Sequence, residues 1–301
     1  MAIQNPQNRV FIASRDNDQL LVVNGNTNQL ITSADTGSQP WGVVVNEATN
    51  RVYVSNFASG DLWIYNAATL AVEKKISLGG QPALAEILPG LDTVFVVVRG
   101  TGKIGVIQGT TLLGLFDSGG SGPYGIAADR VNNRIYIANR DSGHLSALVQ
   151  SGGTWQVRYG PELNDGRTLF DIAYSPTTNK LYAVYAKPGD PTGTDWLVDV
   201  WKPDVNGLWA LLKTIPVGDG GAVSSPQVGG TGIAINPVTG NVLNVNTAAG
   251  TMSVIHGQND YVKTTVTLGT DPYSIAIDPV RNFIYVGLRS SGSVIKVSDG
   301  Y

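Results

Sequence analysis

The sequence has no cysteine, which excludes thiolate nucleophiles, disulfide bonds and cysteine-ligated metal sites. Charged side chains account for only 14% of the 301 residues, and the formal net charge is −3. A low and slightly negative charge disfavours a protein whose whole surface binds nucleic acid or an anionic membrane. The sequence also lacks a hydrophobic run long enough to span a bilayer, and residues 1–30 contain no signal-peptide core.

Glycine, in contrast, is abundant, with 37 residues, which favours tightly turned β-structure over helices. Segments similar to "NRVYVSNFASGDLWIYN" (50–66) recur along the whole chain. They align on one large apolar residue at intervals of about 42 residues, with insertions in two repeats. The seven aligned residues are Phe11, Tyr53, Phe95, Tyr136, Tyr182, Leu243 and Tyr285.

Each repeat predicts four short strands separated by turns rich in Gly, Asn, Asp and Pro. Such a sheet has two faces to bury, and stacking in a ring buries both of them. The sequence therefore predicts an all-β fold, a seven-bladed β-propeller of four-stranded antiparallel blades with short terminal blades. We expect one domain over residues 1–301, with blades at about 1–40, 41–81, 82–122, 123–167, 168–228, 229–271 and 272–301.

The last repeat ends after its third strand, which leaves two arrangements open where the ring closes. Either the seventh blade has three strands, or residues 1–5 pair across the junction between the terminal blades.

Two motifs, "YVSN" (53–56) and "YIAN" (136–139), resemble the signature of the YVTN-repeat β-propellers found in surface-layer proteins. The surrounding frame is similar as well, with a proline at the blade start and a closing "LG". The resemblance covers essentially the whole chain. It implies a secreted, periplasmic or cell-surface location, and a binding or scaffold role more often than a defined reaction. Related propellers of the streptogramin-lyase and lactonase types are enzymes, so the fold alone leaves catalysis open.

In a propeller, the loops that enter each blade and those between its second and third strands share one face, around the mouth of the central channel. Four arginines stand four residues after an aligned residue: Arg15, Arg99, Arg140 and Arg289. They predict a partial positive ring suited to carboxylate, phosphate or sulfate groups. The alternative is pairing with local acids, since Asp16 follows Arg15 and Asp141 follows Arg140.

A second set of candidate ligand-binding residues is aromatic and lies where four blades begin: Trp41, Tyr124, Phe170 and Tyr273. Rings near a channel mouth stack on sugars, bases or aromatic ligands. The alternative is that these rings pack between blades.

Three loops, at 160–171, 186–196 and 217–230, are longer than the repeat requires. Their acids are Asp165, Asp171, Asp190, Asp195 and Asp219. Carboxylates are ligands that Ca²⁺ prefers, but the sequence contains no established calcium-ligand spacing. We therefore expect no cofactor, with calcium as the alternative and Asp171, Asp165 and Asp219 as its candidate ligands.

The only two histidines, His144 and His256, occupy different repeat positions, and no catalytic motif is present, so no catalytic residue is assigned. We expect a monomeric, non-enzymatic binding or scaffold propeller whose loop-rich face binds a protein, a glycan or an anionic ligand. A metal-dependent lyase or lactone hydrolase with its site in the channel mouth is the alternative. Binding of single-stranded nucleic acid is a third reading, which the net charge does not favour.

Overall fold

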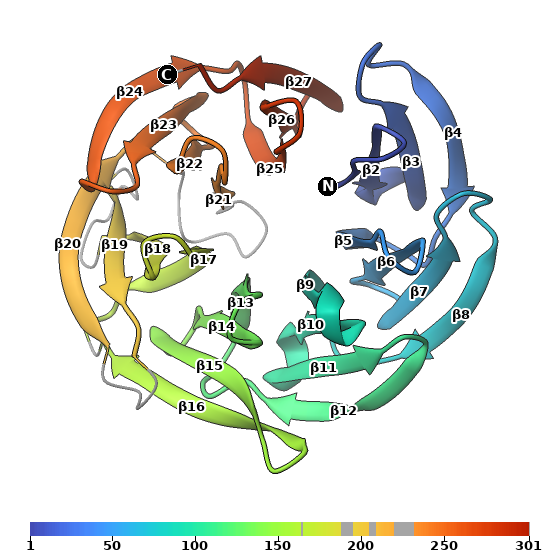
Figure 1. The fold of residues 1–301 in the computed structure, drawn as a ribbon, viewed down its shortest axis with the longest axis horizontal. Coiled ribbons are helices and arrows are strands. Elements are labelled where there is room, and N and C mark those ends of the chain that lie inside the picture. The colour runs from blue at the N-terminus through green and yellow to red at the C-terminus, as the bar shows by residue number, and fades with distance from the viewer. Residues whose placement is uncertain (164, 188–194, 205–208, 220–231, 301) are drawn as a thin grey trace.

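Seven antiparallel sheets surround a common axis and form the predicted seven-bladed β-propeller (Figure 1). The computed structural model describes residues 1–163, 165–187, 195–204, 209–219 and 232–300. Six sheets have four strands and the last has three. No helix among the described residues is long and apolar enough to cross a membrane.

The strands follow one order in every blade, from the channel to the rim. The innermost strands are β1 (Ala2–Gln4), β5 (Pro40–Asn46), β9 (Pro82–Leu88), β13 (Pro123–Asp129), β17 (Thr168–Ser175), β21 (Ile233–Ile235) and β25 (Pro272–Asp278). The second strands are β2 (Arg9–Ser14), β6 (Arg51–Asn56), β10 (Thr93–Val98), β14 (Arg134–Asn139), β18 (Lys180–Ala186), β22 (Asn241–Asn246) and β26 (Phe283–Leu288).

The third strands are β3 (Gln19–Asn24), β7 (Asp61–Asn66), β11 (Lys103–Gln108), β15 (His144–Ser151), β19 (Trp196–Lys202), β23 (Thr251–His256) and β27 (Ser293–Ser298). The outermost strands are β4 (Leu30–Asp35), β8 (Val72–Ser77), β12 (Thr111–Asp117), β16 (Thr154–Glu162), β20 (Ala210–Val217) and β24 (Tyr261–Thr267). Short 3-10 helices stand at three turns: η1 (Arg15–Asn17), η2 (Pro89–Leu91) and η3 (Arg99–Thr101).

Backbone conformation explains why an asparagine recurs just before the second strand of most blades. Asn8, Asn50, Asn133 and Asn282 all have φ between 50° and 56°, in the left-handed region that asparagine tolerates better than most residues. In blade 3, Asp92 has the same conformation with φ 48° at the equivalent turn, between β9 and β10. The turn between the first two strands thus selects the "NR" of the repeat.

The last residue of the "YVSN" motif ties the second strand to the third. Asn56 donates to the Asp61 carboxylate at 2.8 Å, and Asn139 donates to the Ser146 hydroxyl at 3.1 Å. Both asparagines are buried, so these hydrogen bonds provide acceptors for amide N–H groups that water cannot reach.

Apolar packing holds neighbouring blades together. Among the described residues, six apolar clusters each span one boundary, from blades 1 and 2 through blades 6 and 7. The aligned residues of the first six blades lie inside them, and Phe11, Tyr53 and Phe95 have no exposed surface. Burial of these rings explains why the repeat conserves a large apolar residue at this position within the chain.

In blades 2 and 5 the aligned tyrosine also makes a polar contact with the following blade. Tyr53 donates to the carbonyl of Gly109 at 3.1 Å, and Tyr182 donates to the carbonyl of Gly257 at 2.7 Å. Each acceptor lies in the turn between the third and fourth strands of the next blade. We call this hydrogen bond the tyrosine clasp.

The same clasp closes the ring. Tyr285 in the last blade donates to the carbonyl of Gly25 in the first at 2.9 Å, and Lys296 donates to the same oxygen at 3.2 Å. Residues 2–4 pair with β2 inside blade 1, and the sheet of blade 7 ends at β27. Of the two arrangements left open by the sequence, the three-stranded last blade is the one found.

The chain end beyond β27 is fixed on blade 6. The buried Asp299 carboxylate accepts hydrogen bonds from the side chains of Asn236 at 2.6 Å, Thr239 at 2.5 Å and Asn241 at 3.0 Å. This carboxylate therefore joins blades 6 and 7 on the side of the turns between first and second strands.

Candidate functional site

A repeated backbone hydrogen bond places the predicted arginines at the channel mouth. The N–H groups of Arg99, Arg140 and Arg289 donate to the residues that precede the blade-start prolines, Gln81, Gly122 and Asp271, at 2.9–3.0 Å. Phe57 makes the same bond to Gln39 at 2.9 Å. Two positions beyond Gln39, Gly122 and Asp271 stand the predicted aromatic residues Trp41, Tyr124 and Tyr273. In blade 3 the same position, beyond Gln81, is Ala83, so this bond brings the two kinds of position together in three blades.

Each predicted arginine stacks on a predicted aromatic ring. The guanidinium carbon lies 4.6 Å from the Trp41 centroid for Arg15, 5.4 Å from Tyr124 for Arg99, 4.8 Å from Phe170 for Arg140 and 5.2 Å from Tyr273 for Arg289. These distances are those of cation–π contacts. All eight residues predicted from the sequence therefore belong to one arginine–aromatic cluster.

The aromatic side chains meet across the mouth. Tyr124 in blade 4 and Tyr273 in blade 7 begin strands on opposite sides of the ring, β13 and β25 (Figure 1), and their hydroxyl oxygens are 3.1 Å apart. The Tyr124 ring also packs edge-on against Trp41 at 6.4 Å and Phe170 at 6.2 Å. These rings therefore pack on one another across the mouth, and their stacking on a ligand stays a prediction.

Burial separates the four arginines into two kinds. Arg140 is only 6% exposed, whereas Arg15, Arg99 and Arg289 are partly exposed. Burial lowers the pKa of Arg140, and the neighbouring charge of Arg99 lowers it further. Burial likewise raises the pKa of the Tyr124 hydroxyl. Arg140 therefore belongs to the floor of the mouth, and the other three guanidinium groups are closer to solvent.

Two of these guanidinium groups have hydrogen-bonded partners that fix their direction. Arg289 forms a bidentate pair with Asp271, with N–O distances of 2.9 and 3.0 Å. Arg15 donates to the side-chain oxygen of Gln39 at 3.1 Å. The alternative that the arginines pair with nearby acids therefore holds for Arg289. Its partner, Asp271, lies in the loop that leads into blade 7 and does not directly follow Arg289 in sequence.

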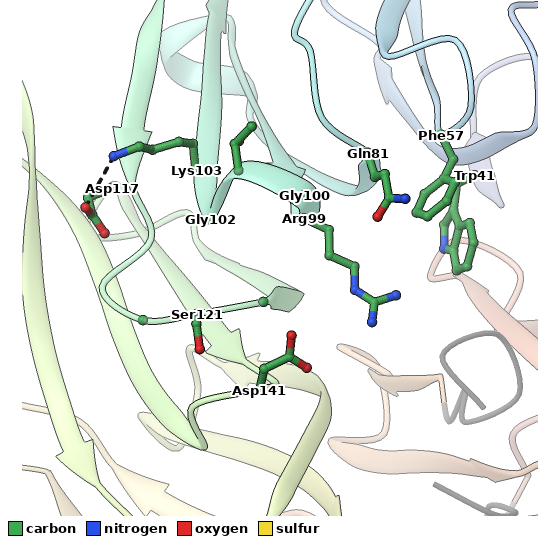
Figure 2. Close-up of a pocket in the computed structure, with 13 residues that line it drawn as sticks. Trp41, Phe57, Gln81, Arg99, Gly100, Gly102, Lys103, Asp117, Ser121 and Asp141 are labelled. Carbon is green, nitrogen blue, oxygen red and sulfur yellow. Dashed lines mark hydrogen bonds and ion pairs between the residues drawn. The ribbon is translucent and has the colours of Figure 1, made fainter. Parts of the chain in front are cut away.

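A pocket of about 740 Å³ opens beside the cluster, between blades 2, 3 and 4. Figure 2 shows Arg99 extending from η3 into the space between Trp41 and Phe57 on one side and Asp141 on the other. Lys103 and Asp117 form an ion pair at its far wall, with an N–O distance of 3.4 Å. The volume lies in the range of pockets that bury a small ligand.

Of the residues that line this pocket, the sequence predicted Trp41 and Arg99 as ligand-binding residues and missed the others, among them Phe57, Gln81 and Asp141. Phe57 holds the repeat position that is arginine in four blades, and its ring packs against Trp41 with centroids 5.0 Å apart. Gln81 and Asp141 flank the pocket on either side of Arg99. For Phe57 the available signal was positional, since it stands at the repeat position that is arginine in four blades, whereas Gln81 and Asp141 left no comparable signal.

Asp171 contacts the neighbouring blade. It stands at the position held by Gly42, Gly125 and Gly232 in three other blades, as the pairings of Gly125 with Ala138 and Asp171 with Val184 show. Its carboxylate accepts the N–H of Ile172 at 2.9 Å and the N–H of Ile233 in blade 6 at 3.3 Å. Burial raises its pKa from 3.8 to about 7, although both N–H groups oppose this change.

The other metal-ligand candidates have separate surroundings. The Asp165 carboxylate binds Arg167, with N–O distances of 2.9 Å to Nε, and this hydrogen bonding lowers its pKa. Asp219 accepts the N–H of Ala249 at its backbone carbonyl, at 3.1 Å. Within the described residues, no group of three His, Asp or Glu side chains is placed to hold a metal ion. Asp190 and most of the loop 217–230 lie outside the described residues.

Comparisons with known proteins bear on the fold. No protein-family model matches the sequence, and no curated protein matches it. The structure is similar to a chain of hydrazine synthase from Kuenenia stuttgartiensis, with a TM-score of 0.84 and 15% identity over 99% of this chain and 94% of that one. It is also similar to a functionally unknown protein from Desulfotomaculum acetoxidans DSM 771, with a TM-score of 0.70 and 14% identity over 89% and 86%. At these identities the likeness supports the seven-bladed propeller fold alone.

Proposed function

We propose that this propeller is a non-enzymatic binding protein that holds an anionic ligand at its channel mouth. The observation that carries the proposal is the convergence of four guanidinium groups on four aromatic rings beside a pocket of about 740 Å³. Arginine donates planar pairs of hydrogen bonds to carboxylate, phosphate or sulfate groups. A ring held against the same guanidinium adds a flat surface for the rest of the ligand.

The arrangement is suited to binding because it is already organised. The Arg15 side chain is held by Gln39 and that of Arg289 by Asp271, and the Arg99 guanidinium stacks on Tyr124. Side chains fixed before the ligand arrives lose little conformational freedom on binding. The mouth therefore needs little rearrangement to accept an anion.

The resemblance of "YVSN" and "YIAN" to the YVTN-repeat propellers supports a secreted, periplasmic or cell-surface location for this function. The absence of cysteine is compatible with that location, since the fold depends on no thiol chemistry. A glycan or protein carrying the anionic group is the partner class that such a location offers.

Titration with acetate, sulfate and phosphate, followed by tryptophan fluorescence at low salt, tests the proposal. We expect saturable, salt-sensitive quenching that weakens about tenfold in Arg99→Gln and Arg15→Gln. Arg130→Gln is the matched control, because Arg130 lies in the turn between β13 and β14, outside the pocket, and pairs with Glu86 at an N–O distance of 3.2 Å. Equal binding by all three variants and the parent protein would contradict the proposal.

A hydrolytic or lyase activity in the channel mouth is the second candidate. Its support is the Asp171 carboxylate, whose pKa of about 7 suits a group that exchanges protons at neutral pH, and the likeness to a chain named for an enzyme. A turnover screen with lactone and uronide substrates, with and without added divalent cations, tests it. Activity that is abolished by Asp171→Asn would replace the binding proposal.

A further inference from the structure

The side chains that line the pocket beside Arg99 favour one class of anion over others. Two cations and two acids line the pocket among the described residues, Arg99 and Lys103 against Asp117 and Asp141. Lys103 is paired with Asp117. The formal charges of this wall therefore cancel, which gives no net attraction to a polyanion.

The local arrangement of those charges is uneven. Arg99 projects into the space, and Asp141 stands across from it (Figure 2). One carboxylate next to Arg99 gains a charge-assisted hydrogen bond, while a second anionic group would approach Asp141 and be repelled. The ligand that this pattern favours carries one negative charge per recognised unit, with hydrogen-bond donors on its other side.

The remaining wall suits a saturated ring with hydroxyl groups. Trp41 and Phe57 present adjoining rings, tilted by 32°. Gln81, Ser121 and Asp141 supply an amide, a hydroxyl and a carboxylate. An apolar ring face therefore packs on the aromatic wall while hydroxyls meet the polar wall. Sugar rings have this division between an apolar face and polar edges.

We propose that the pocket between blades 2, 3 and 4 binds uronic acid residues of an acidic polysaccharide. The carboxylate of the uronate pairs with Arg99, its ring packs on Trp41, and its hydroxyls donate to Asp141. This assignment rests on the proposed anion-binding function and names the ligand class for the same site.

Calorimetric titration with trigalacturonate, maltotriose and a sulfated heparin oligosaccharide tests the assignment. We expect trigalacturonate to bind about tenfold or more tightly than neutral maltotriose, and more tightly than the sulfated oligosaccharide. Arg99→Gln should remove the preference for trigalacturonate over maltotriose. Trp41→Leu should weaken both sugars together, because it alters the surface that any sugar ring uses.

Asp141→Asn provides the sharpest control, because it keeps the shape and hydrogen-bonding capacity of the side chain and removes its charge. It should raise affinity for the sulfated oligosaccharide and leave trigalacturonate within about threefold. Arg130→Gln, on an arginine outside the pocket, should leave all affinities unchanged.

The outcomes separate the two proposals. Arg99-dependent binding of acetate or phosphate without preference for trigalacturonate would overturn the uronate assignment and keep the anion-binding function. Tighter Arg99-dependent binding of heparin would overturn it in favour of a polyanion, and tighter binding of an acidic peptide in favour of a protein partner. Absence of all anion binding would overturn both proposals.

Discussion

The boundary between blades 7 and 1 can be compared with that between blades 2 and 3, since the chain runs through only the second. Both carry the tyrosine clasp, Tyr285 to Gly25 at 2.9 Å and Tyr53 to Gly109 at 3.1 Å. At the seam a second donor, Lys296, reaches the same carbonyl. Between blades 5 and 6 a lysine likewise reaches the clasp carbonyl, Lys180 to Gly257 at 3.2 Å. The comparison therefore shows that the ring is closed by a contact that also joins ordinary neighbours, without exchange of strands between the terminal blades.

The largest effect is expected at the last residues of the chain, where the three-stranded blade is anchored. Asp299→Ala removes the acceptor for Asn236, Thr239 and Asn241 and leaves buried donors without it. We expect a loss of about 3 kcal/mol or more in the free energy of unfolding, measured by urea denaturation. The exposed Asp16→Ala is the control. An equal, small effect of both substitutions would mean that blade 7 needs no such anchor.

A smaller loss is expected where inner strands of adjacent blades approach each other. A Cβ atom on Gly125 would lie 2.7 Å from Asp171 Cα and 3.0 Å from the Phe170 carbonyl oxygen, so backbone would have to move. Gly125→Ala should cost about 2 kcal/mol, read from the urea midpoint. Gly90→Ala serves as control, because no atom lies within 4 Å of its added Cβ. An equal midpoint for both variants would show that the channel walls are not closely packed.

The link between blades 5 and 6 is expected to depend on pH. The pKa of Asp171 in the folded protein, about 7, exceeds its ordinary value of 3.8, so the folded state binds this proton more tightly. Its contribution to stability is fully present below about pH 4 and is lost as the pH rises through about 7. Asp171→Asn should flatten the stability profile between pH 4 and 8 by about 1–2 kcal/mol. Parallel profiles for the two proteins would exclude this assignment.

The smallest effects test the clasp itself. Tyr53→Phe should cost about 1 kcal/mol in the free energy of unfolding, because the Gly109 carbonyl loses its hydroxyl donor. Tyr285→Phe should cost less, since Lys296 continues to donate to Gly25. The double variant Tyr285→Phe/Lys296→Met should lose at least as much free energy of unfolding as Tyr53→Phe, because both donors to the Gly25 carbonyl are then removed. A larger cost for Tyr285→Phe alone would show that the seam is the weaker boundary.

The repeat made the fold predictable because the same physical requirements return in each blade. The buried ring of Tyr53 and the left-handed turn at Asn50 leave a clear trace in sequence. The arginine and aromatic positions could be paired for the same reason, as both are repeat positions. Asp141 and Gln81 could not be assigned, because a pocket wall is set by how three blades meet and not by any one repeat. The closing contact of Tyr285 was hidden too, since its acceptor is the backbone carbonyl of a turn glycine, and glycine recurs in many turns of this sequence.

The tyrosine clasp bears on how such a ring can change over time. At three boundaries the clasp joins a tyrosine hydroxyl to the carbonyl oxygen of a glycine in the same turn of the following blade, so the contact depends on these two repeat positions. Those turns lie on the side of the ring opposite the predicted mouth. Binding residues can therefore diversify on one face while the joints on the other face stay the same.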